Sequence, residues 1–149
     1  MCHRNRGIRS SAGMLAGAAA ALIGAAAPAA AETLSVQLRS VRSAKGEIQL
    51  DLYTPDRKRA GKKRVAARAG AMRVDFENLA AGAYAVYVYH DENGNGKLDT
   101  GGLLGLPIEG YAFSNDAPVR FGPPSIEKLK VILPKGGTAS TNATLKYRK

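Results

Sequence analysis

Hydrophobic and polar residues alternate with a period of two along much of the chain after position 32. This period places alternate side chains on opposite faces of a β-strand, so it predicts strands with one buried face. The alternating segments are 33–39, 48–53, 72–77, 83–90, 128–133 and 139–147. In 83–90 both sets of side chains are bulky or apolar, which indicates a central strand covered on both sides.

Turn signals separate these segments. Residues 43–46 lie between the first two strands, and we expect them to close a hairpin. Pro55 ends the second strand, and 78–82 turns the chain between the third and fourth. We also expect a short helical turn at 125–128. Six or seven short strands separated by turns predict a single all-β sandwich.

The first 31 residues have a different composition. Arg4, Arg6 and Arg9 precede an apolar, alanine-rich run, and 29–31 has the A-x-A form of a signal-peptidase site. We therefore expect 1–31 to be a cleaved secretory signal, and 32–149 to be one domain in the periplasm or outside the cell. A retained membrane anchor is the alternative, but the run is short of the roughly 20 strongly apolar residues that a span needs.

Residues 32–149 are basic and contain no cysteine. They carry 19 Lys and Arg against 12 Asp and Glu, a net charge of +7. Stability must therefore come from packing and from any bound metal, without disulfides. The positive charge predicts attraction to anionic surfaces but identifies no partner.

The densest group of cations lies just after the second strand. It consists of Arg57, Lys58, Arg59, Lys62, Lys63, Arg64 and Arg68. It is either a patch for anionic lipid or polysaccharide, or an exposed connection whose charge serves solubility. We favour the connection, and expect no nucleic acid as partner, because no aromatic residues for base stacking are interleaved.

The segment 91–102 follows the pattern of a calcium-binding loop. Such loops take side-chain oxygens from positions 1, 3 and 5, a sharp turn at Gly 6, a carbonyl from position 7 and often a water-mediated oxygen at 9. These positions hold Asp91, Asn93, Asn95, Gly96, Lys97 and Asp99. The sequence thus predicts one Ca²⁺ site.

The loop departs from the pattern at position 12, where a bidentate Glu normally sits and this chain has Gly102. Because only two formal negative charges remain, we expect weak binding, with Kd on the order of 10⁻⁴ to 10⁻³ M. Glu109, seven residues further on, is the candidate for the missing carboxylate. The alternative is a plain polar connection, since Asn-Gly pairs are strong turn signals and the segment has two.

Residues 101–124 are rich in Gly, Pro and Asn, yet they contain large apolar side chains. These are Leu103, Leu104, Leu106, Ile108, Tyr111, Phe113 and Phe121. A long segment without regular structure tends to be functional. Its apolar residues either line a ligand groove beside the metal or plug the end of the sandwich. We favour the plug, because large exposed apolar patches are rare in monomers.

No enzymatic site is predicted. His90 is a candidate general base, but no Ser, Cys or second metal-type His is near it in sequence, and a lone His beside a turn is usually structural. Residues 125–128 match the Ser-x-x-Lys of serine acyltransferases, but the other motifs of those enzymes are missing.

Two stretches carry a family resemblance. Residues 76–86, F-E-N-L-A-A-G-A-Y-A-V, resemble a hairpin of prealbumin-like and carboxypeptidase-regulatory-like sandwich domains. The run 90–99, followed by 105–115 and 121–124, resembles the bacterial secreted domain-of-unknown-function family numbered 2141. The resemblance covers nearly all of 32–149. It implies an exported, Ig-like or transthyretin-like antiparallel sandwich of about seven strands with no established activity.

Two functional hypotheses follow. In the first, a monomeric, non-enzymatic module holds one Ca²⁺, which orders 101–124 as a surface for a ligand or a partner in the cell envelope. In the second, no metal binds, and the 57–68 cations hold the protein to anionic lipid or polysaccharide. The second requires binding that weakens with salt, and the first does not.

Overall fold

The computed structural model describes residues 32–120 and 122–148. The predicted secretory signal, 1–31, and Phe121 lie outside these described residues. The elements are β1 (Glu32–Val41), β2 (Glu47–Tyr53), β3 (Arg59–Ala66), β4 (Gly70–Leu79), β5 (Gly82–Asp91), β6 (Thr100–Gly101), β7 (Leu106–Pro107), β8 (Gly110–Phe113), the 3-10 helix η1 (Ser114–Asp116), α1 (Ile126–Leu129), β9 (Val131–Leu133) and β10 (Thr138–Thr144).

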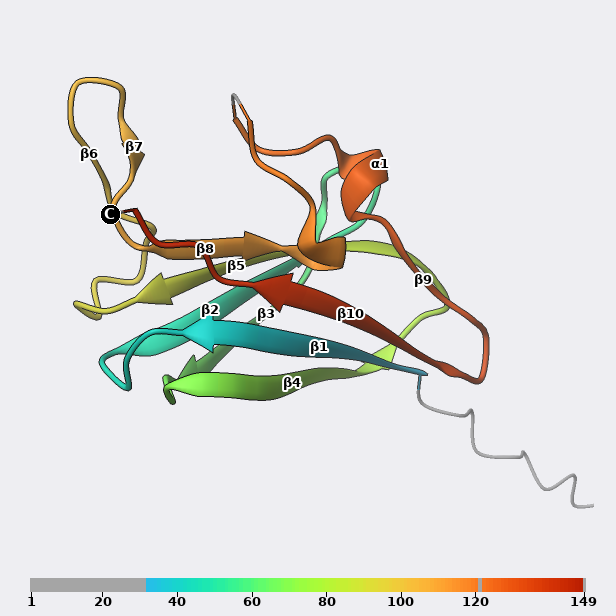
Figure 1. Ribbon diagram of the computed structural model, residues 1–149. Helices are drawn as coiled ribbons and strands as arrows, with labels where there is room; N and C mark the ends of the chain where they lie inside the picture. The colour runs from blue at the N-terminus through green and yellow to red at the C-terminus, as the bar shows by residue number, and fades with distance from the viewer. Residues whose placement is uncertain (1–31, 121, 149) are drawn as a thin grey trace, which may run out of the picture.

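Two sheets pack face to face (Figure 1). The smaller has the strand order β10-β1-β4, and the larger has β3-β2-β5-β8, with β9 also paired to β5. β9 pairs with the start of β5 and β8 with its end, so the two share one edge of that strand. The prediction of an all-β sandwich is confirmed.

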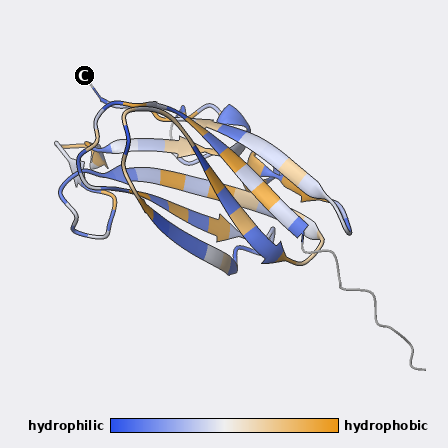
Figure 2. Ribbon diagram, turned by 90° about the horizontal axis from the view of Figure 1, so that it is seen from below, coloured by the Kyte–Doolittle hydropathy of each residue, from blue (hydrophilic) through white to orange (hydrophobic). Residues whose placement is uncertain are grey.

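The core lies between the sheets, where the apolar positions of each alternating strand meet. It includes Leu34, Val36 and Leu38 from β1 and Leu50 and Val86 from the larger sheet, all with at most 1% of their surface exposed. Figure 2 shows the alternation of hydrophobic and hydrophilic residues along the strands. The period-two pattern therefore identified the faces that form the core, although in β2 the polar face is buried as well.

The predicted hairpin between the first two strands is wrong. β1 pairs with β4 and β10, whereas β2 pairs with β3 and β5, so the turn at 43–46 crosses from one sheet to the other. The turn at 78–82 likewise leads from β4 to a strand of the opposite sheet. Alternation specifies which face of a strand is buried and leaves its neighbours undetermined, because both arrangements bury the same side chains.

β1 and β10 form a parallel pair, in register from Thr33↔Thr138 to Arg39↔Thr144. The first and last strands of the sandwich are therefore neighbours in the smaller sheet. The other strand pairs are antiparallel among the residues that the structure describes.

The basic segment is not the exposed connection that we favoured, because most of it forms the edge strand β3. Val65 packs against the core from this strand. Lys63 also turns inward, with its ammonium 5.8 Å from the centre of the Phe76 ring and donating to the Asp75 carbonyl. An edge strand accepts such a lysine because the aliphatic stem packs while the charged head reaches a polar partner.

The segment 101–124 is also more regular than predicted, since it contains β6, β7, β8 and η1. Ser114 is buried at the start of η1, where its hydroxyl donates to the Leu129 carbonyl (2.6 Å) and accepts from the Val86 N–H (3.0 Å). α1 takes up part of the strand predicted at 128–133, which leaves Val131–Leu133 as β9.

The outer face of β5 is partly covered, as its two apolar faces predicted. Ala85 is buried with Ala117 and Leu129 in a small second cluster, against which Tyr87 and Phe113 pack. Within the part of the chain that the structure describes, no helix has the length and apolar character to cross a membrane.

Candidate functional site

The predicted calcium loop begins at the last residue of β5. Asp91 is fully buried, and its carboxylate accepts three hydrogen bonds, from the backbone N–H groups of Asn95 (3.0 Å) and Gly96 (2.7 Å) and from the Gln49 amide (2.8 Å). A carboxylate without water needs such donors, because burial otherwise penalises its charge. Asp91 thereby curls the chain that follows it.

Two further side-chain oxygens are held by turns of the same loop. Asn93 Oδ1 accepts from the Asn95 N–H, and Asn95 Oδ1 accepts from the Lys97 N–H, each at 3.0 Å. Asn side chains commonly bond the backbone two residues on in this way. Gly96 has φ +82, a backbone conformation that favours glycine, as predicted for the sharp turn.

Asp99 closes the loop. Its carboxylate accepts hydrogen bonds from the side-chain amides of Asn95 (2.8 Å to each oxygen) and Asn93 (2.5 Å). These bonds, with a smaller contribution from the charge of Lys97, lower the pKa of Asp99. The structure thus brings together the four side chains that the sequence pattern selected.

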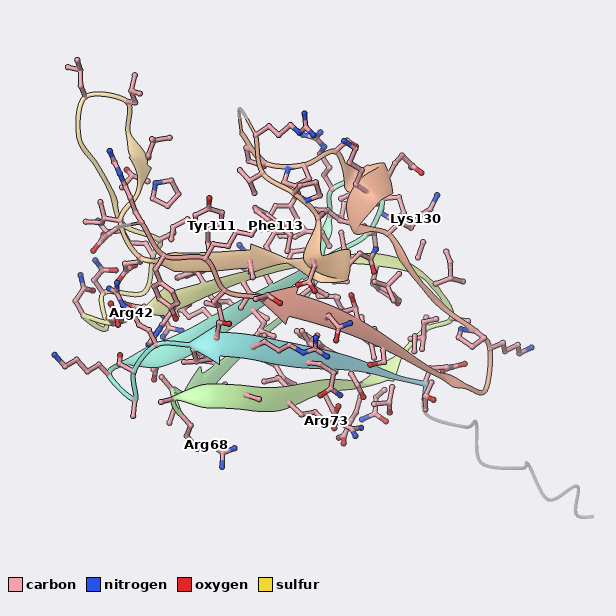
Figure 3. All side chains as sticks on the ribbon, in the orientation of Figure 1. Arg42, Arg68, Arg73, Tyr111, Phe113 and Lys130 are labelled. Carbon is pink, nitrogen blue, oxygen red and sulfur yellow. The ribbon has the colours of Figure 1, made fainter. Side chains whose placement is uncertain are left out.

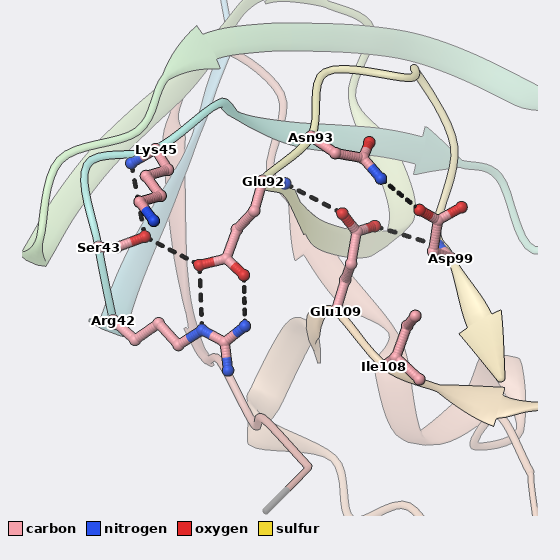
Figure 4. Close-up of a pocket in the computed structure, with 8 residues that line it drawn as sticks. All are labelled: Arg42, Ser43, Lys45, Glu92, Asn93, Asp99, Ile108 and Glu109. Carbon is pink, nitrogen blue, oxygen red and sulfur yellow. Dashed lines mark hydrogen bonds and ion pairs between the residues drawn. The ribbon is translucent and has the colours of Figure 1, made fainter. Parts of the chain in front are cut away.

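Glu109 reaches the loop and joins its two ends. It is largely buried, with Oε1 accepting from the Glu92 N–H and Oε2 from the Asp99 N–H, both at 3.0 Å (Figure 4). Each oxygen of a carboxylate has two lone pairs, so both retain capacity for another partner. The observed role of Glu109 is to bond the backbone of the loop.

Glu92 points away from the loop into a separate ion pair. Arg42 binds it with two nitrogens, one of them Nε at 3.0 Å, and Ser43 Oγ donates to the same carboxylate at 2.8 Å. The hydrogen bonds from Arg42, more than those from Ser43, lower the pKa of Glu92 to about 2.

An open hollow of about 620 Å³ lies between the β1–β2 turn, the loop and the segment after β7. Its lining combines both charges with one apolar side chain. The residues are Arg42, Ser43, Lys45, Glu92, Asn93, Asp99, Ile108 and Glu109 (Figure 4).

His90 is fully buried behind this hollow, and both of its ring nitrogens have protein partners. Nε2 lies 2.7 Å from the Lys45 carbonyl, which can only accept, so this nitrogen carries the proton in the neutral ring. Nδ1 then accepts from the Tyr147 hydroxyl at 2.8 Å. This arrangement fits the structural role expected for His90.

The loop resembles a site for a hard cation. Asp91, Asn93, Asn95 and Asp99 offer carboxylate and amide oxygens, the ligand class that Ca²⁺ and Mg²⁺ prefer. The side-chain NH₂ groups of Asn93 and Asn95 point at the Asp99 carboxylate. Their partial positive charges lie where a bound cation would neutralise that carboxylate. Among the described residues, no group of three or more His, Cys, Asp and Glu side chains is placed to hold a metal, so a cation here depends on amide and backbone oxygens.

The predicted basic patch is divided by ion pairs. Lys58 pairs with Asp56 at 2.9 Å, Arg59 with Asp51 at 3.3 Å, and Arg64 approaches Glu47 at 4.0 Å. Lys63 is turned toward the core as described above. β3 is therefore not a continuous row of unpaired cations.

Sequence reasoning missed two residues that hold the site. Gln49 was expected on an exposed face but is fully buried, where its amide bonds both Asp91 and the Tyr89 hydroxyl (2.8 Å each). Arg42 was not singled out, although it holds Glu92. Both partners are more than 40 residues away along the chain, and no local pattern marks such a pairing.

The apolar residues of 101–124 also depart from expectation. Leu103, Leu104, Leu106 and Ile108 are exposed and neither plug the sandwich nor line an apolar groove. Tyr111 and Phe113 are half-buried on the outer side of β8, with ring centres 6.1 Å apart (Figure 3).

The fold and the loop define a small two-sheet β-sandwich module with an oxygen-rich loop at one end of its largest sheet. A family model described as "Uncharacterized protein conserved in bacteria (DUF2141)" matches residues 36–142. The chain belongs to this bacterial family, and the resemblance expected from its motifs is confirmed. Comparisons with curated proteins and with solved structures gave no match.

Proposed function

We propose that this protein is a non-enzymatic, exported binding module in which the 91–102 loop binds one Ca²⁺ weakly. The cation would be held by the side chains of Asp91, Asn93, Asn95 and Asp99, with the Lys97 carbonyl and Glu109 completing the site. Its effect is to order the chain after the loop, 101–124, as a surface for a ligand or an envelope partner.

One observation carries this proposal: Asp99 belongs to both the loop and the base of the β6–β7 hairpin. Its carboxylate contacts the loop amides, its N–H donates to Glu109 (3.0 Å), and its carbonyl accepts from the Ile108 N–H (2.9 Å). β6 begins at the next residue. A cation bound by Asp99 would therefore restrict both strands of the hairpin.

Two further observations support the other parts of the proposal. The ring nitrogens of His90, the candidate base, are engaged by Lys45 and Tyr147, which favours binding over catalysis. The composition of 1–31 favours export.

The experiment is a thermal unfolding series in EDTA and in increasing Ca²⁺. Ca²⁺ at about ten times its Kd should add about 1.4 kcal/mol to the free energy of unfolding, a rise of about 5 °C in the midpoint. Asp99→Asn keeps the shape of the side chain but removes its charge, and should abolish most of the rise. Asp91→Ala is a poor probe, because it removes three hydrogen bonds whether or not a cation binds.

The matched control is Asp56→Asn, which neutralises an exposed carboxylate in the turn after β2 and leaves the loop intact. It should retain the full Ca²⁺ response. The calcium proposal is wrong if the unaltered protein shows no rise at about 10 mM Ca²⁺, or if Asp99→Asn responds equally.

The alternative, that the 57–68 cations hold the protein to anionic lipid or polysaccharide without a metal, stays a prediction. The ion pairs that these cations form with Asp56, Asp51 and Glu47 count against it. A salt series tests it, because binding through these cations should weaken steeply with ionic strength.

A further inference from the structure

We propose that the tip of the β6–β7 hairpin inserts into the surface of an anionic phospholipid bilayer, with Leu103 and Leu104 as the inserting side chains. This inference names the partner of the surface proposed above and rests on the hairpin having that role. It is carried by the exposure of the tip, the geometry of its turn and the charges around its base.

The tip exposes apolar side chains to an unusual degree. Leu103 is 104% exposed and Leu104 is 79% exposed. Five large hydrophobic residues are exposed in the part of the chain that the structure describes, and four of them lie within 103–108. The hairpin stands clear of both sheets (Figure 1). These leucines therefore contribute nothing to the packing of the sandwich.

The turn itself directs the leucines outward. The Gly105 N–H donates to the Gly102 carbonyl at 3.2 Å, so Leu103 and Leu104 occupy the two central positions of a four-residue turn. In an exposed turn these positions are usually occupied by glycine, proline or short polar residues, which tolerate contact with water. The hairpin has two paired positions, Thr100↔Pro107 and Gly101↔Leu106. The two leucines at its apex lie beyond these pairs and remain uncovered. The apex is thus suited to an apolar surrounding.

The size and charge of the hairpin favour a membrane over a protein. Residues 100–108 contain no charged side chain. A stable protein interface buries about 800 Å² on each partner, more than an eight-residue hairpin tip offers, whereas insertion at a bilayer surface requires only a few apolar side chains.

Cations stand around the base of the hairpin, as an anionic surface requires. The Arg148 guanidinium lies beside Gly102, Lys97 is in the loop, and Lys45 lines the hollow next to Ile108. None of these three cations has an ion pair with another described residue. Stable membrane binding needs electrostatic attraction in addition to apolar insertion, and basic groups beside the inserted segment supply that attraction.

Of the nearby carboxylates, Asp99 stays charged at the surface and offsets part of this charge, mainly that of Lys97, whereas the other two are already engaged by protein partners. Glu92 is bound by Arg42, and Glu109 is largely buried against backbone N–H groups. β1 enters the sandwich at Glu32, at the far end of the molecule from the hairpin (Figure 1). The hairpin end is therefore free to approach a membrane.

The chain contains no tryptophan, so a single introduced indole reports on its own position. The experiment compares Leu104→Trp with Ile132→Trp in the full 149-residue chain, because Ile132 on β9 is also exposed (62%) but lies outside the hairpin. Each variant is titrated with vesicles of phosphatidylglycerol and phosphatidylcholine, and with phosphatidylcholine alone. The indole of Leu104→Trp should shift to the blue with the anionic vesicles and be quenched by brominated acyl chains, while that of Ile132→Trp does neither.

A second substitution tests the role of the neighbouring leucine. Adding Leu103→Asp to the Leu104→Trp reporter should raise the lipid concentration for half-maximal shift about tenfold or more. The reason is that a leucine inserted in the bilayer is replaced by a charged side chain. Adding Ile132→Asp to the same reporter should leave that concentration unchanged. Far-UV circular dichroism verifies that each variant is folded.

Three results would overturn the inference. They are no shift in Leu104→Trp, an equal shift in both tryptophan variants, and a concentration-dependent shift without vesicles, which would instead indicate contact between two copies of the chain. The titrations are run in EDTA and in Ca²⁺. If Ca²⁺ raises the unfolding midpoint but the hairpin does not insert, only the membrane proposal is rejected. If the hairpin inserts but Ca²⁺ does not change the midpoint, only the calcium proposal is rejected.

Discussion

Buried carboxylates organise the backbone of the 91–102 loop residue by residue. Asp91 and Glu109 between them accept four backbone N–H groups, from Glu92, Asn95, Gly96 and Asp99. A loop has no sheet partner for its N–H groups, and buried backbone groups are almost always paired. The two carboxylates therefore give this loop a defined shape through side chains.

The Glu92–Arg42 pair should make stability depend on acid. The pKa of Glu92 falls from its ordinary 4.5 to about 2 on folding, so its contribution is complete above pH 4.5 and is lost as the pH falls through about 2. Glu92 is 19% exposed and Arg42 45%, so screening limits the effect. Glu92→Gln should lower the free energy of unfolding by about 1–2 kcal/mol near pH 7 and by much less near pH 2, measured by urea unfolding.

The control for this prediction is Glu127→Gln. Glu127 pairs with Lys130 at the surface and is 67% exposed, so its loss should change stability little at either pH. If Glu92→Gln costs the same free energy at both pH values, the ion pair is not the source of the acid dependence.

At the level of elements, the β1–β2 turn is fitted tightly to the start of the loop. Gly46 has φ +65, and a Cβ at this position would lie 1.9 Å from the Asp91 carbonyl oxygen. Both the backbone conformation and the lack of space exclude a larger residue. The turn thus packs closely against the end of β5, at the point where β2 begins beside it.

Gly46→Ala should therefore destabilise the protein by about 3 kcal/mol or more, since the three nearest atoms all belong to the backbone of Asp91 and Glu92. Equilibrium unfolding in guanidinium chloride measures the loss. Gly82→Ala is the matched change, because a Cβ there meets no atom within 4 Å. Similar costs for the two substitutions would show that the turn tolerates a side chain.

The elements also show what the sequence can predict and what it cannot. Alternation located the strands and their buried faces, because side-chain period is a local property of the backbone. It did not reveal the neighbours of β1, which lie about 40 and 100 residues away, or the strand β3, whose inward positions include Gly61 and Lys63. Long-range pairing depends on the whole core and leaves no mark within one segment.

The candidate site follows the same division. Spacing selected Asp91, Asn93, Asn95 and Asp99, which the structure brings together, because ligand spacing is written into one short loop. Glu109 was also named as a candidate and reaches the loop, whereas Gln49 and Arg42 were not predicted. The exposure of Leu103 and Leu104 ran against the prediction that these residues plug the sandwich, since apolar character alone does not distinguish a core residue from an exposed one.

For the whole molecule, one core joins the two sheets. The main cluster contains buried residues from β1, β2, β4, β5, β8, β9 and β10, and the second cluster, on the outer face of β5, has only three buried residues. Denaturation should therefore be a single transition, with circular dichroism and tyrosine fluorescence giving the same midpoint.

Substitutions on opposite sides of the core test this cooperativity. Leu38→Ala in the smaller sheet and Leu50→Ala in the larger one both remove fully packed side chains, and each should cost about 2–5 kcal/mol. Each should move both spectroscopic midpoints together. A variant that separates the two midpoints would show that the sheets unfold independently.

The parallel pairing of β1 with β10 also sets an order in time. Thr33 and its partner Thr138 are separated by 105 residues, so the first strand made must wait for the last before the smaller sheet is complete. Until residues 138–144 are available to pair, β1 has an open edge in the smaller sheet. The smaller sheet is therefore complete only once β10 is available, and pairings at this distance place folding in the range of milliseconds to seconds.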